Sequence, residues 1–389
     1  MIYFVCIFLI FIGIYKYDYC KTKVGYRKLY YIILTLFVAI SGFGYRLGID
    51  SVYFYMPYYD YVKSSWIFDL SKILNSEFQP GWVLFCCLSK TLSSEYFVMK
   101  LFHAFIVNFV IFHTIKTYTR YVFTVILFYF CCKYFYFNFE ILRESLAIAV
   151  FLLIVKYYIN SDWKKYFLGA FAATMFHISA FFLIILPFFK WIKVTKKIFF
   201  LVSITGICMM LFSAFIFPYF SFLSNIGMFA AKTEAYMQSE TFGTTATIDF
   251  SLLKYLTFFA FIPLYMLWLF HKKNIDIKYS PLILAFIVIR FIALSFPILF
   301  RLNNYLYIFL FLFYIESIIY ITKVHLPKFK KIGVVGLSLL FIYADSASSF
   351  RELRDSGYKQ YHLYYPYSSV FDKSLDAERE ALLYEMRWY

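Results

Sequence analysis

The chain has 389 residues, of which 63% are hydrophobic and only 15% are charged, and its formal net charge is +16. Its mean hydropathy of +0.70 and the small number of charged side chains exclude a soluble globular domain. The basic excess does not indicate a nucleic-acid-binding protein either, because the Lys and Arg residues lie in short loops between apolar runs. These runs are long enough to cross a bilayer, so the composition predicts an all-α polytopic membrane protein.

The apolar segments predict about 11–12 transmembrane helices, with one or two short or re-entrant helices among them. In chain order the segments are 2–15, 29–45, 96–117, 121–138, 141–159, 166–189, 198–220, 250–270, 280–297, 302–321 and 332–347. The first segment follows no basic residues and contains no small-residue cleavage site. We therefore interpret it as a retained helix and not as a signal peptide.

Lys and Arg residues gather in alternate loops, which the positive-inside rule assigns to the cytoplasm. These loops are 16–28, 116–120, 156–165, 190–197, 271–278 and 322–331. The remaining polar segments together carry more acidic than basic residues, which predicts that they face outward: 46–79, 138–144, 221–249, the turn before residue 302 and the tail. We expect a multi-helix membrane domain over residues 1–347 and an extracytoplasmic tail over residues 348–389.

Two segments depart from this simple alternation. Segment 166–189 has lysines at both ends, and a hairpin that turns near His177 would keep both lysine clusters on the cytoplasmic side. Each arm would be about 18 Å long, too short to cross a hydrocarbon core of about 30 Å; one ordinary span is the alternative. Segment 80–93 is also short and begins with Pro-Gly, which predicts an interfacial or re-entrant helix.

Seven cysteines are present, six of them inside apolar segments. Their number is odd, and the sequence contains neither a CxxC pair nor a Cys/His cluster with zinc-ligand spacing. We therefore expect no disulfide framework, no metal site and no cofactor.

Charged side chains within or next to membrane spans are costly, so each is a candidate functional residue. Four arginines lie at or above the outer half of the predicted domain, where their planar forks suit phosphate oxygens: Arg46, Arg143, Arg290 and Arg301. A salt bridge or helix-end contact with Glu144 or Glu140 is the structural alternative for Arg143, and snorkelling is the alternative for Arg46 and Arg301. Three acid–base candidates accompany them: Asp50, His177 and Glu144.

Aromatic residues crowd the segment after Asp50, in "SVYFYMPYYDY", and recur in the tail. Rings of this kind mark membrane interfaces, and they also suit stacking on the faces of sugars. The candidate glycan-binding residues are Tyr53, Tyr55, Trp82, Tyr305, Tyr365 and Tyr367.

Short motifs near the N-terminus resemble those of the Wzy-type polysaccharide polymerases in the EpsG-like family. In "RLGIDSVYFY", Gly48 and Asp50 resemble the start of a G-x-D-x-x-x-Y signature, with Phe54 at the last position and tyrosines on either side of it. "FQPGWVLF" is similar to an F-E-x-G-Y element, but Gln79 stands where a glutamate is usual and Trp82 where a tyrosine is usual.

Later motifs follow in the same order. "LRESLAIAV", with Arg143, resembles an R-x-x-x-A helix start, and "FHISAFF", with His177 and Ser179, resembles an F-H-x-S-A element. "RLNNYL" resembles a late R-x-x-x-Y helix, and "YYPYSSV" resembles a closing Y-x-P-Y tail. The resemblance spans residues 45–370, which is most of the chain.

This resemblance implies a fold similar to the GT-C superfamily and an O-antigen or related polymerase in the bacterial inner membrane, with its site facing the periplasm. The donor would be a growing glycan on undecaprenyl pyrophosphate, and the acceptor would be the non-reducing end of a repeat unit on a second lipid carrier. The outward segments carry no Asp-x-Asp motif, so the four arginines would stabilise the leaving group in place of a metal. Asp50 or His177 would be the base, with Glu144 third.

The expected partners are these lipid-linked glycans, membrane lipid and a chain-length regulator, and no nucleic acid. Two other functional classes stay open. One is a lipid-linked oligosaccharide flippase or other transporter, although such proteins often show internal repeats and none is visible here. The other is an O-antigen ligase-like enzyme or an acyltransferase.

Overall fold

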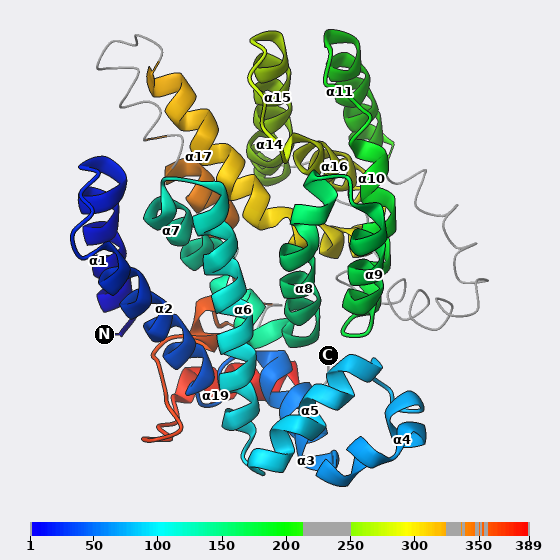
Figure 1. The fold of residues 1–389 in the computed structure, drawn as a ribbon. Helices are drawn as coiled ribbons and strands as arrows, with labels where there is room; N and C mark the ends of the chain where they lie inside the picture. Colours follow the sequence, from blue (N-terminus) through cyan, green and yellow to red (C-terminus); the bar gives the residue numbers. More distant parts are fainter. Residues whose placement is uncertain are drawn as a thin grey trace. The chain divides into compact units, whose positions relative to one another are not determined.

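The computed structural model describes residues 2–212, 250–323, 336, 339–346, 350, 352–353 and 357–387. Within these ranges the chain forms helices and no β-strand, apart from two isolated bridges. Figure 1 shows α2 (Tyr26–Gly42) and α6 (Tyr96–Tyr118) side by side within one part of the chain. The chain is an all-α polytopic membrane protein, as its composition predicts. The predicted outer loop at 221–249, residues 213–220 of the predicted span 198–220, and residues 332–335, 337–338 and 347 of the predicted span 332–347 lie outside the described residues.

The chain divides into two compact units, of which the first comprises Met1–Phe181 and Asp345–Tyr389. Its helices include short π- and 3₁₀-helical pieces, named η. They are α1 Ile2–Gly13, η1 Ile14–Tyr19, α2 Tyr26–Gly42, η2 Ser51–Tyr55, α3 Met56–Tyr61, η3 Ser64–Phe68, α4 Leu70–Leu74, α5 Pro80–Leu92, α6 Tyr96–Tyr118, α7 Val122–Cys132, η4 Tyr136–Glu140, α8 Leu142–Ile159, α9 Trp163–Thr174, η10 Gln360–Leu363 and α19 Ala377–Met386.

The second unit comprises Phe182–Ala344, and η5 Ile178–Ile185 crosses the boundary between the two. Its helices are α10 Leu186–Phe189, α11 Lys196–Leu211, α14 Phe250–Leu256, η7 Thr257–Phe261, α15 Ile262–Lys272, α16 Ser280–Ile292, η8 Pro297–Leu306 and α17 Tyr307–Lys323.

Four helical stretches of the described chain are long and apolar enough to cross a membrane: Ile2–Tyr19, Tyr96–Tyr118, Leu252–Lys272 and Leu299–Ile321. Shorter apolar helices occur at Val122–Cys132, Ile178–Phe189 and Ser280–Ile292. The count of about 11–12 spans therefore stays a prediction. α5 covers the segment for which the sequence predicts an interfacial or re-entrant helix, and its depth in a membrane stays a prediction too.

A closed set of hydrogen bonds joins three helical elements inside the first unit. Asn108 on α6 donates to Asn138 Oδ1 at 2.8 Å, and Tyr129 on α7 donates to Asn108 Oδ1 at 3.0 Å. Asn138 on η4 donates in turn to the Tyr129 hydroxyl at 3.1 Å. All three side chains are buried, so each polar group needs such a partner. The network fixes η4, which ends at Glu140, against α6 and α7.

A tight turn follows α2 and leads into the segment that carries Asp50. Gly48 has φ of 81°, a left-handed conformation that favours glycine. A Cβ at this position would lie 2.8 Å from the Cβ of Phe139, which is closer than real side chains approach. The turn therefore needs glycine for both its backbone angle and its close contact with η4.

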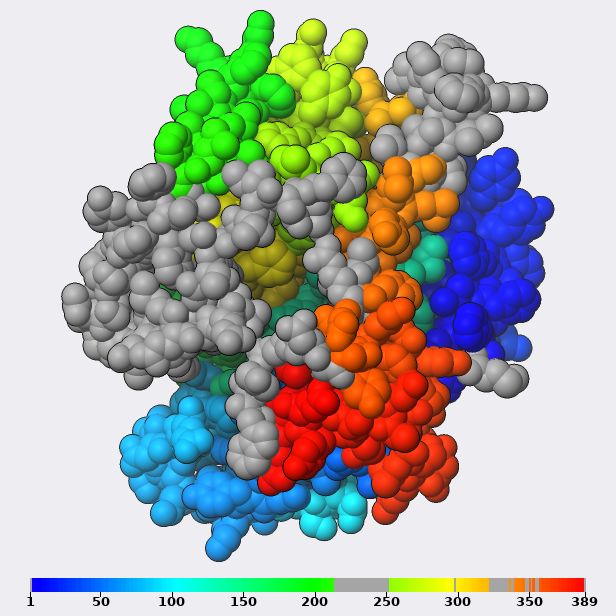
Figure 2. All heavy atoms as spheres, turned by 180° about the vertical axis from the view of Figure 1, so that it is seen from behind, coloured from blue at the N-terminus to red at the C-terminus, as the bar shows by residue number. Residues whose placement is uncertain are grey.

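The tail packs on this turn through an apolar cluster. The buried members of the cluster are Leu47, Val52, Phe139, Leu363, Tyr364, Leu382, Leu383 and Met386. Backbone bonds add to it, since Tyr45 donates to the Ser368 carbonyl and Val370 donates to the Phe43 carbonyl, each at 2.9 Å. In Figure 2 the red C-terminal residues lie against the blue residues of the first outer segment. The tail is thus an integral layer of the first unit.

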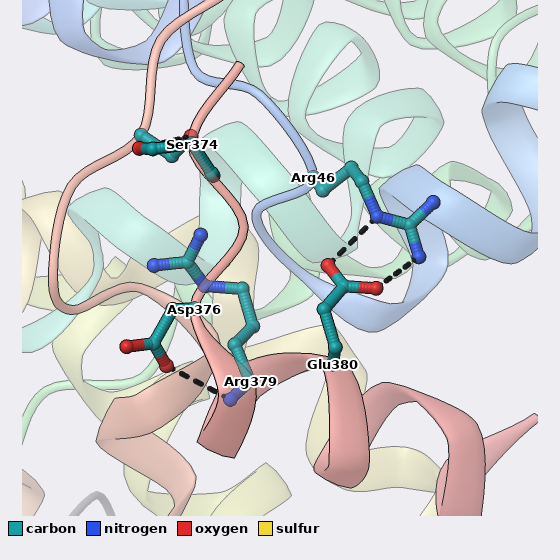
Figure 3. A network of polar contacts seen from close by, with 6 residues as sticks. Arg46, Ser374, Asp376, Arg379 and Glu380 are labelled. Atoms are coloured by element: carbon teal, nitrogen blue, oxygen red, sulfur yellow. Dashed lines mark hydrogen bonds and ion pairs between the residues drawn. The ribbon is translucent and has the colours of Figure 1, made fainter. Parts of the chain in front are cut away.

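A bidentate ion pair closes this contact. Arg46 donates from Nε to Glu380 Oε1 at 2.8 Å and from Nη2 to Glu380 Oε2 at 2.6 Å (Figure 3). Glu380 lies in the first turn of α19, which Asp376 caps by accepting the Arg379 N–H at 2.9 Å. The carboxylate raises the pKa of Arg46 above its usual value. Arg46, a predicted pyrophosphate ligand, is engaged by the tail in this structure.

Reversing the Arg46–Glu380 pair tests whether it docks the tail. Arg46→Glu and Glu380→Arg each place like charges together, and we expect each to lower the free energy of unfolding by about 1 kcal/mol and to expose the tail to protease. The double variant restores opposite charges and is expected to recover most of the loss. Thermal unfolding and limited proteolysis of detergent-purified protein measure both effects.

Glu385→Gln, a change at an exposed residue of the same helix, is the matched control and is expected to behave as the wild type. If the loss of unfolding free energy in the double variant equalled the sum of the losses in the two single variants, the pair would not stabilise the tail.

Candidate functional site

The segment that carries Asp50 is held by a buried carboxylate. Glu140 accepts the backbone N–H groups of Ile49 at 3.2 Å and Asp50 at 3.0 Å, and it accepts the Tyr364 hydroxyl at 2.6 Å. Burial raises the pKa of Glu140, while these three donors act in the opposite direction by stabilising its charged form. Glu140 therefore ties residues 49–50 and the tail to the start of α8.

Lys100 on α6 lies near this carboxylate. It is buried, and its Nζ lies 4.3 Å from the centre of the Phe139 ring. A buried carboxylate is tolerated where hydrogen-bond donors surround it, and Glu140 accepts from three of them.

Arg143 lies at the first turn of α8 and reaches toward the aromatic segment. Its Nη1 donates to Gln79 Oε1 at 3.0 Å, and its guanidinium lies 4.1 Å from the centre of the Phe78 ring and 6.0 Å from that of Tyr55. Its Nε is buried without a hydrogen-bond acceptor in the described part of the chain. Arg143 is thus positioned by stacking and by a neutral amide, and no described ion pair neutralises its charge.

Tyr55 and Trp82 form the buried floor beside Arg143. Their ring centres lie 5.3 Å apart, and both side chains are at most 5% exposed. Burial raises the pKa of Tyr55 to about 12; Arg143 lowers this pKa and the carboxylate of Asp50 raises it. Arg143 and Asp50 therefore both lie near Tyr55. The Nε1 of Trp82 is a buried donor with no described acceptor.

The start of α5 meets the end of α9. Gly81 donates its N–H to the Met175 carbonyl at 2.7 Å, and a Cβ at Gly81 would lie only 2.7 Å from that carbonyl oxygen. His177 follows two residues later, at the point where α9 has ended and η5 begins. The Pro-Gly start of α5 therefore brings the histidine segment beside the elements that carry Gln79 and Trp82.

The hydrogen bonds of His177 define its tautomer. Its Nδ1 accepts the Ser179 backbone N–H at 3.3 Å and lies 2.6 Å from Ser179 Oγ. A backbone N–H can only donate, so Nδ1 is an acceptor and the neutral ring carries its hydrogen on Nε2. In this state Nδ1 cannot take up a proton without losing the hydrogen bond from the Ser179 N–H.

The first unit thus brings four motif-bearing segments together: the turn with Asp50 and Tyr55, the start of α5 with Gln79 and Trp82, the start of α8 with Arg143, and the turn with His177. Such an arrangement offers a fixed cation, polar donors and a half-buried carboxylate in a largely apolar setting. These are the groups that a transfer reaction with an anionic leaving group requires.

Glu144, the third acid–base candidate, lies one residue after Arg143 but is only 1% exposed. It belongs to the first turn of α8, where a carboxylate is stabilised by the helix dipole. This placement favours a structural role for Glu144 over proton transfer to a substrate.

The other two candidate arginines belong to the second unit. Arg290 on α16 is 1% exposed and donates from Nη2 to the Tyr307 hydroxyl at 2.7 Å. Five rings surround its guanidinium at 4.0 to 5.8 Å: Phe300, Tyr255, Phe286, Phe259 and Tyr307. Its Nε and Nη1 are buried without a described acceptor. Arg301 is half-buried on η8.

The candidate glycan-binding rings differ widely in exposure. Tyr305 is fully buried against Phe182, as Tyr55 and Trp82 are buried in their own unit. Tyr53 and Tyr367 are partly buried at the edge of the apolar cluster of the tail, and Tyr365 keeps 46% of its surface exposed. Packing accounts for the buried rings without a ligand, and a role in glycan binding stays a prediction for all six.

The sequence motifs gave Glu140 only as a salt-bridge or helix-end partner of Arg143, and they contained Tyr364 only as part of the closing "YYPYSSV" motif. Arg143 bonds instead to Gln79, and Glu140 is occupied by the Asp50 turn. The available signal was the position of Glu140 at the end of an apolar run, because a carboxylate in such a setting needs hydrogen-bond donors nearby. The identity of those donors depends on the tertiary fold.

No curated protein and no solved structure shows significant similarity to the chain. The model of the EpsG family matches residues 27–369, which cover most of the chain and include the turn with Asp50, the start of α8 and the tail through Tyr364. This match confirms the resemblance seen in the short motifs, and it indicates a function of the polysaccharide-polymerase type. The chain therefore belongs to the EpsG family.

Proposed function

We propose that the protein joins repeat units of a surface polysaccharide at the outer face of the bacterial inner membrane. The growing glycan leaves undecaprenyl pyrophosphate and is transferred to the non-reducing end of a repeat unit on a second lipid carrier. The observation that carries the proposal is the convergence of the turn with Asp50, the start of α5, Arg143 and the segment of His177 within one compact unit. Family membership supports the same general activity.

Arg143 and His177 are suited to the leaving group. The bond between the anomeric carbon and the pyrophosphate oxygen breaks, and that oxygen departs with the electron pair. Arg143 offers its guanidinium, including the buried Nε, and His177 offers the hydrogen on Nε2. Fixed donors of this kind stabilise developing negative charge without reorganising.

Arg290 and Arg301 remain proposed pyrophosphate ligands. The two buried donors of Arg290 that have no described acceptor support this role, although its aromatic cage also stabilises the cation by itself. Arg46 binds pyrophosphate only when its ion pair with Glu380 is broken. The charge-reversed double variant separates these roles for Arg46, because it restores tail docking without restoring an arginine at position 46.

Asp50 is the proposed base. Its carboxylate lies near Tyr55, which also lies beside Arg143. Its backbone N–H donates to Glu140. The acceptor hydroxyl gives its proton to Asp50 while its oxygen bonds to the anomeric carbon. The tautomer of His177 and the burial of Glu144 favour Asp50 over both alternatives.

Substitution of Arg143 tests the leaving-group step. We expect Arg143→Ala to reduce polymer formation by about 10²-fold, as the loss of one transition-state donor does in other enzymes. Arg143→Lys keeps the charge but loses the planar fork, so an intermediate loss is expected. The length distribution of surface glycan in a complemented deletion strain measures both, with membrane protein levels checked by immunoblot. Wild-type ladders from Arg143→Ala would overturn the assignment.

A second set of substitutions distinguishes donor from base. His177→Gln retains an amide N–H in place of the Nε2 donor, so we expect partial polymer formation, whereas His177→Ala should abolish it. Asp50→Asn removes the proton acceptor and is expected to abolish polymer formation. If His177→Gln were as inactive as His177→Ala while Asp50→Asn kept activity, the histidine would be the base.

The glycan of a deletion strain separates polymerisation from rival functions. A single repeat unit on the lipid core indicates loss of a polymerase. Absence of any glycan indicates loss of a flippase, and accumulation of free carrier-linked polymer indicates loss of a ligase. Cysteine labelling at residue 50 tests the outward orientation, which cytoplasmic reactivity would contradict.

A further inference from the structure

A cavity lies beside the turn with Asp50, on the side of the tail. The cavity has a volume of about 450 Å³, within the roughly 300–1,000 Å³ typical of ligand pockets. Its walls come from the turn after α2, from η2 and α3, from the start of α6 and from residues 370–373 of the tail. All of these elements belong to the first unit.

The cavity combines aromatic faces with hydrogen-bonding groups. Phe97 and Phe371 line it, and both lie against the ring of Phe43, at centre distances of 6.2 and 5.0 Å. Phe371 is 77% exposed, so its ring is accessible to a ligand in the cavity. Tyr96 on another wall shares a hydrogen bond of 3.0 Å with Ser51.

The charges in the cavity exclude it as a second pyrophosphate site. The carboxylates of Asp60 and Glu95 and the ammonium of Lys373 line it, and none of the three takes part in an ion pair of the described chain. Arg46 also lines it, but Glu380 neutralises this arginine. Two carboxylates against one available cation repel a polyanion. They suit the hydroxyl groups of an uncharged sugar, because carboxylates are strong acceptors.

The cavity is also next to the proposed chemistry. Ser51, in its wall, directly follows Asp50 in the chain, so the cavity borders the segment that carries the proposed base. We propose that this cavity is a subsite for neutral saccharide, which holds the sugars of the acceptor repeat unit while its terminal hydroxyl meets Asp50. This assignment as an acceptor subsite rests on the proposed polymerase function.

A direct binding measurement tests the subsite. The probe is the free, lipid-less repeat-unit oligosaccharide released by mild acid from the surface polymer of the source organism. Binding to the purified full-length protein in nanodiscs is followed by saturation-transfer NMR and titration. We expect wild-type binding in the millimolar range, weakened about tenfold in the double variant Asp60→Asn, Glu95→Gln and at least fivefold in Phe371→Ala. Inorganic pyrophosphate is expected not to displace the oligosaccharide.

Glu385→Gln is the matched control, since it removes an equally exposed carboxylate that does not line the cavity. Unchanged affinity in both cavity variants, or displacement by pyrophosphate, would overturn the subsite. Absence of wild-type binding, in a strain background where Asp50→Asn abolishes polymer, would overturn the subsite and leave the polymerase proposal standing. Long polymer from both Asp50→Asn and Arg143→Ala strains would instead remove the polymerase mechanism itself.

Discussion

The carboxylate of Glu140 is the contact on which the arrangement of the first unit depends. It joins three parts of the chain that have no sequence proximity: the Asp50 turn, the start of α8 and the tail. Two backbone donors and one tyrosine hydroxyl compensate for its burial. Without this acceptor, two N–H groups and a buried hydroxyl would each lack a partner, at a cost of about 1–3 kcal/mol apiece. The position of Asp50 is therefore a consequence of a neighbouring acid.

The surroundings of Glu140 are built to keep it in place. The network of Asn108, Asn138 and Tyr129 fixes the short π-helical piece that presents Glu140, and the glycine at position 48 lets the opposite turn come within contact distance. In a chain with so few polar side chains, closed hydrogen-bond networks of this kind specify register where apolar packing alone would permit sliding. In the proposed mechanism, such rigid support would position the acceptor hydroxyl.

The sequence predicted the all-α polytopic fold and the family, because apolar run length and short motifs are local properties. It also singled out the segments that carry Tyr55, Gln79 and Arg143, which lie together in the first unit. It did not predict the hydrogen-bond partners of the arginines. Arg143 pairs with the amide of Gln79, and Arg46 pairs with Glu380, 334 residues away. Pairings over such separations depend on how helices pack, and composition or periodicity contains no information about them. The close approach of Gly48 to Phe139 is likewise a tertiary contact.

The hydrogen bond from Tyr364 to Glu140 has a consequence for biosynthesis. These residues are separated by 224 positions, so the helices around Glu140 are made and inserted long before their last donor leaves the ribosome. During that interval Glu140 has only its two backbone donors. Synthesis of the segment that carries Tyr364 is thus the step that completes the hydrogen bonding of Glu140.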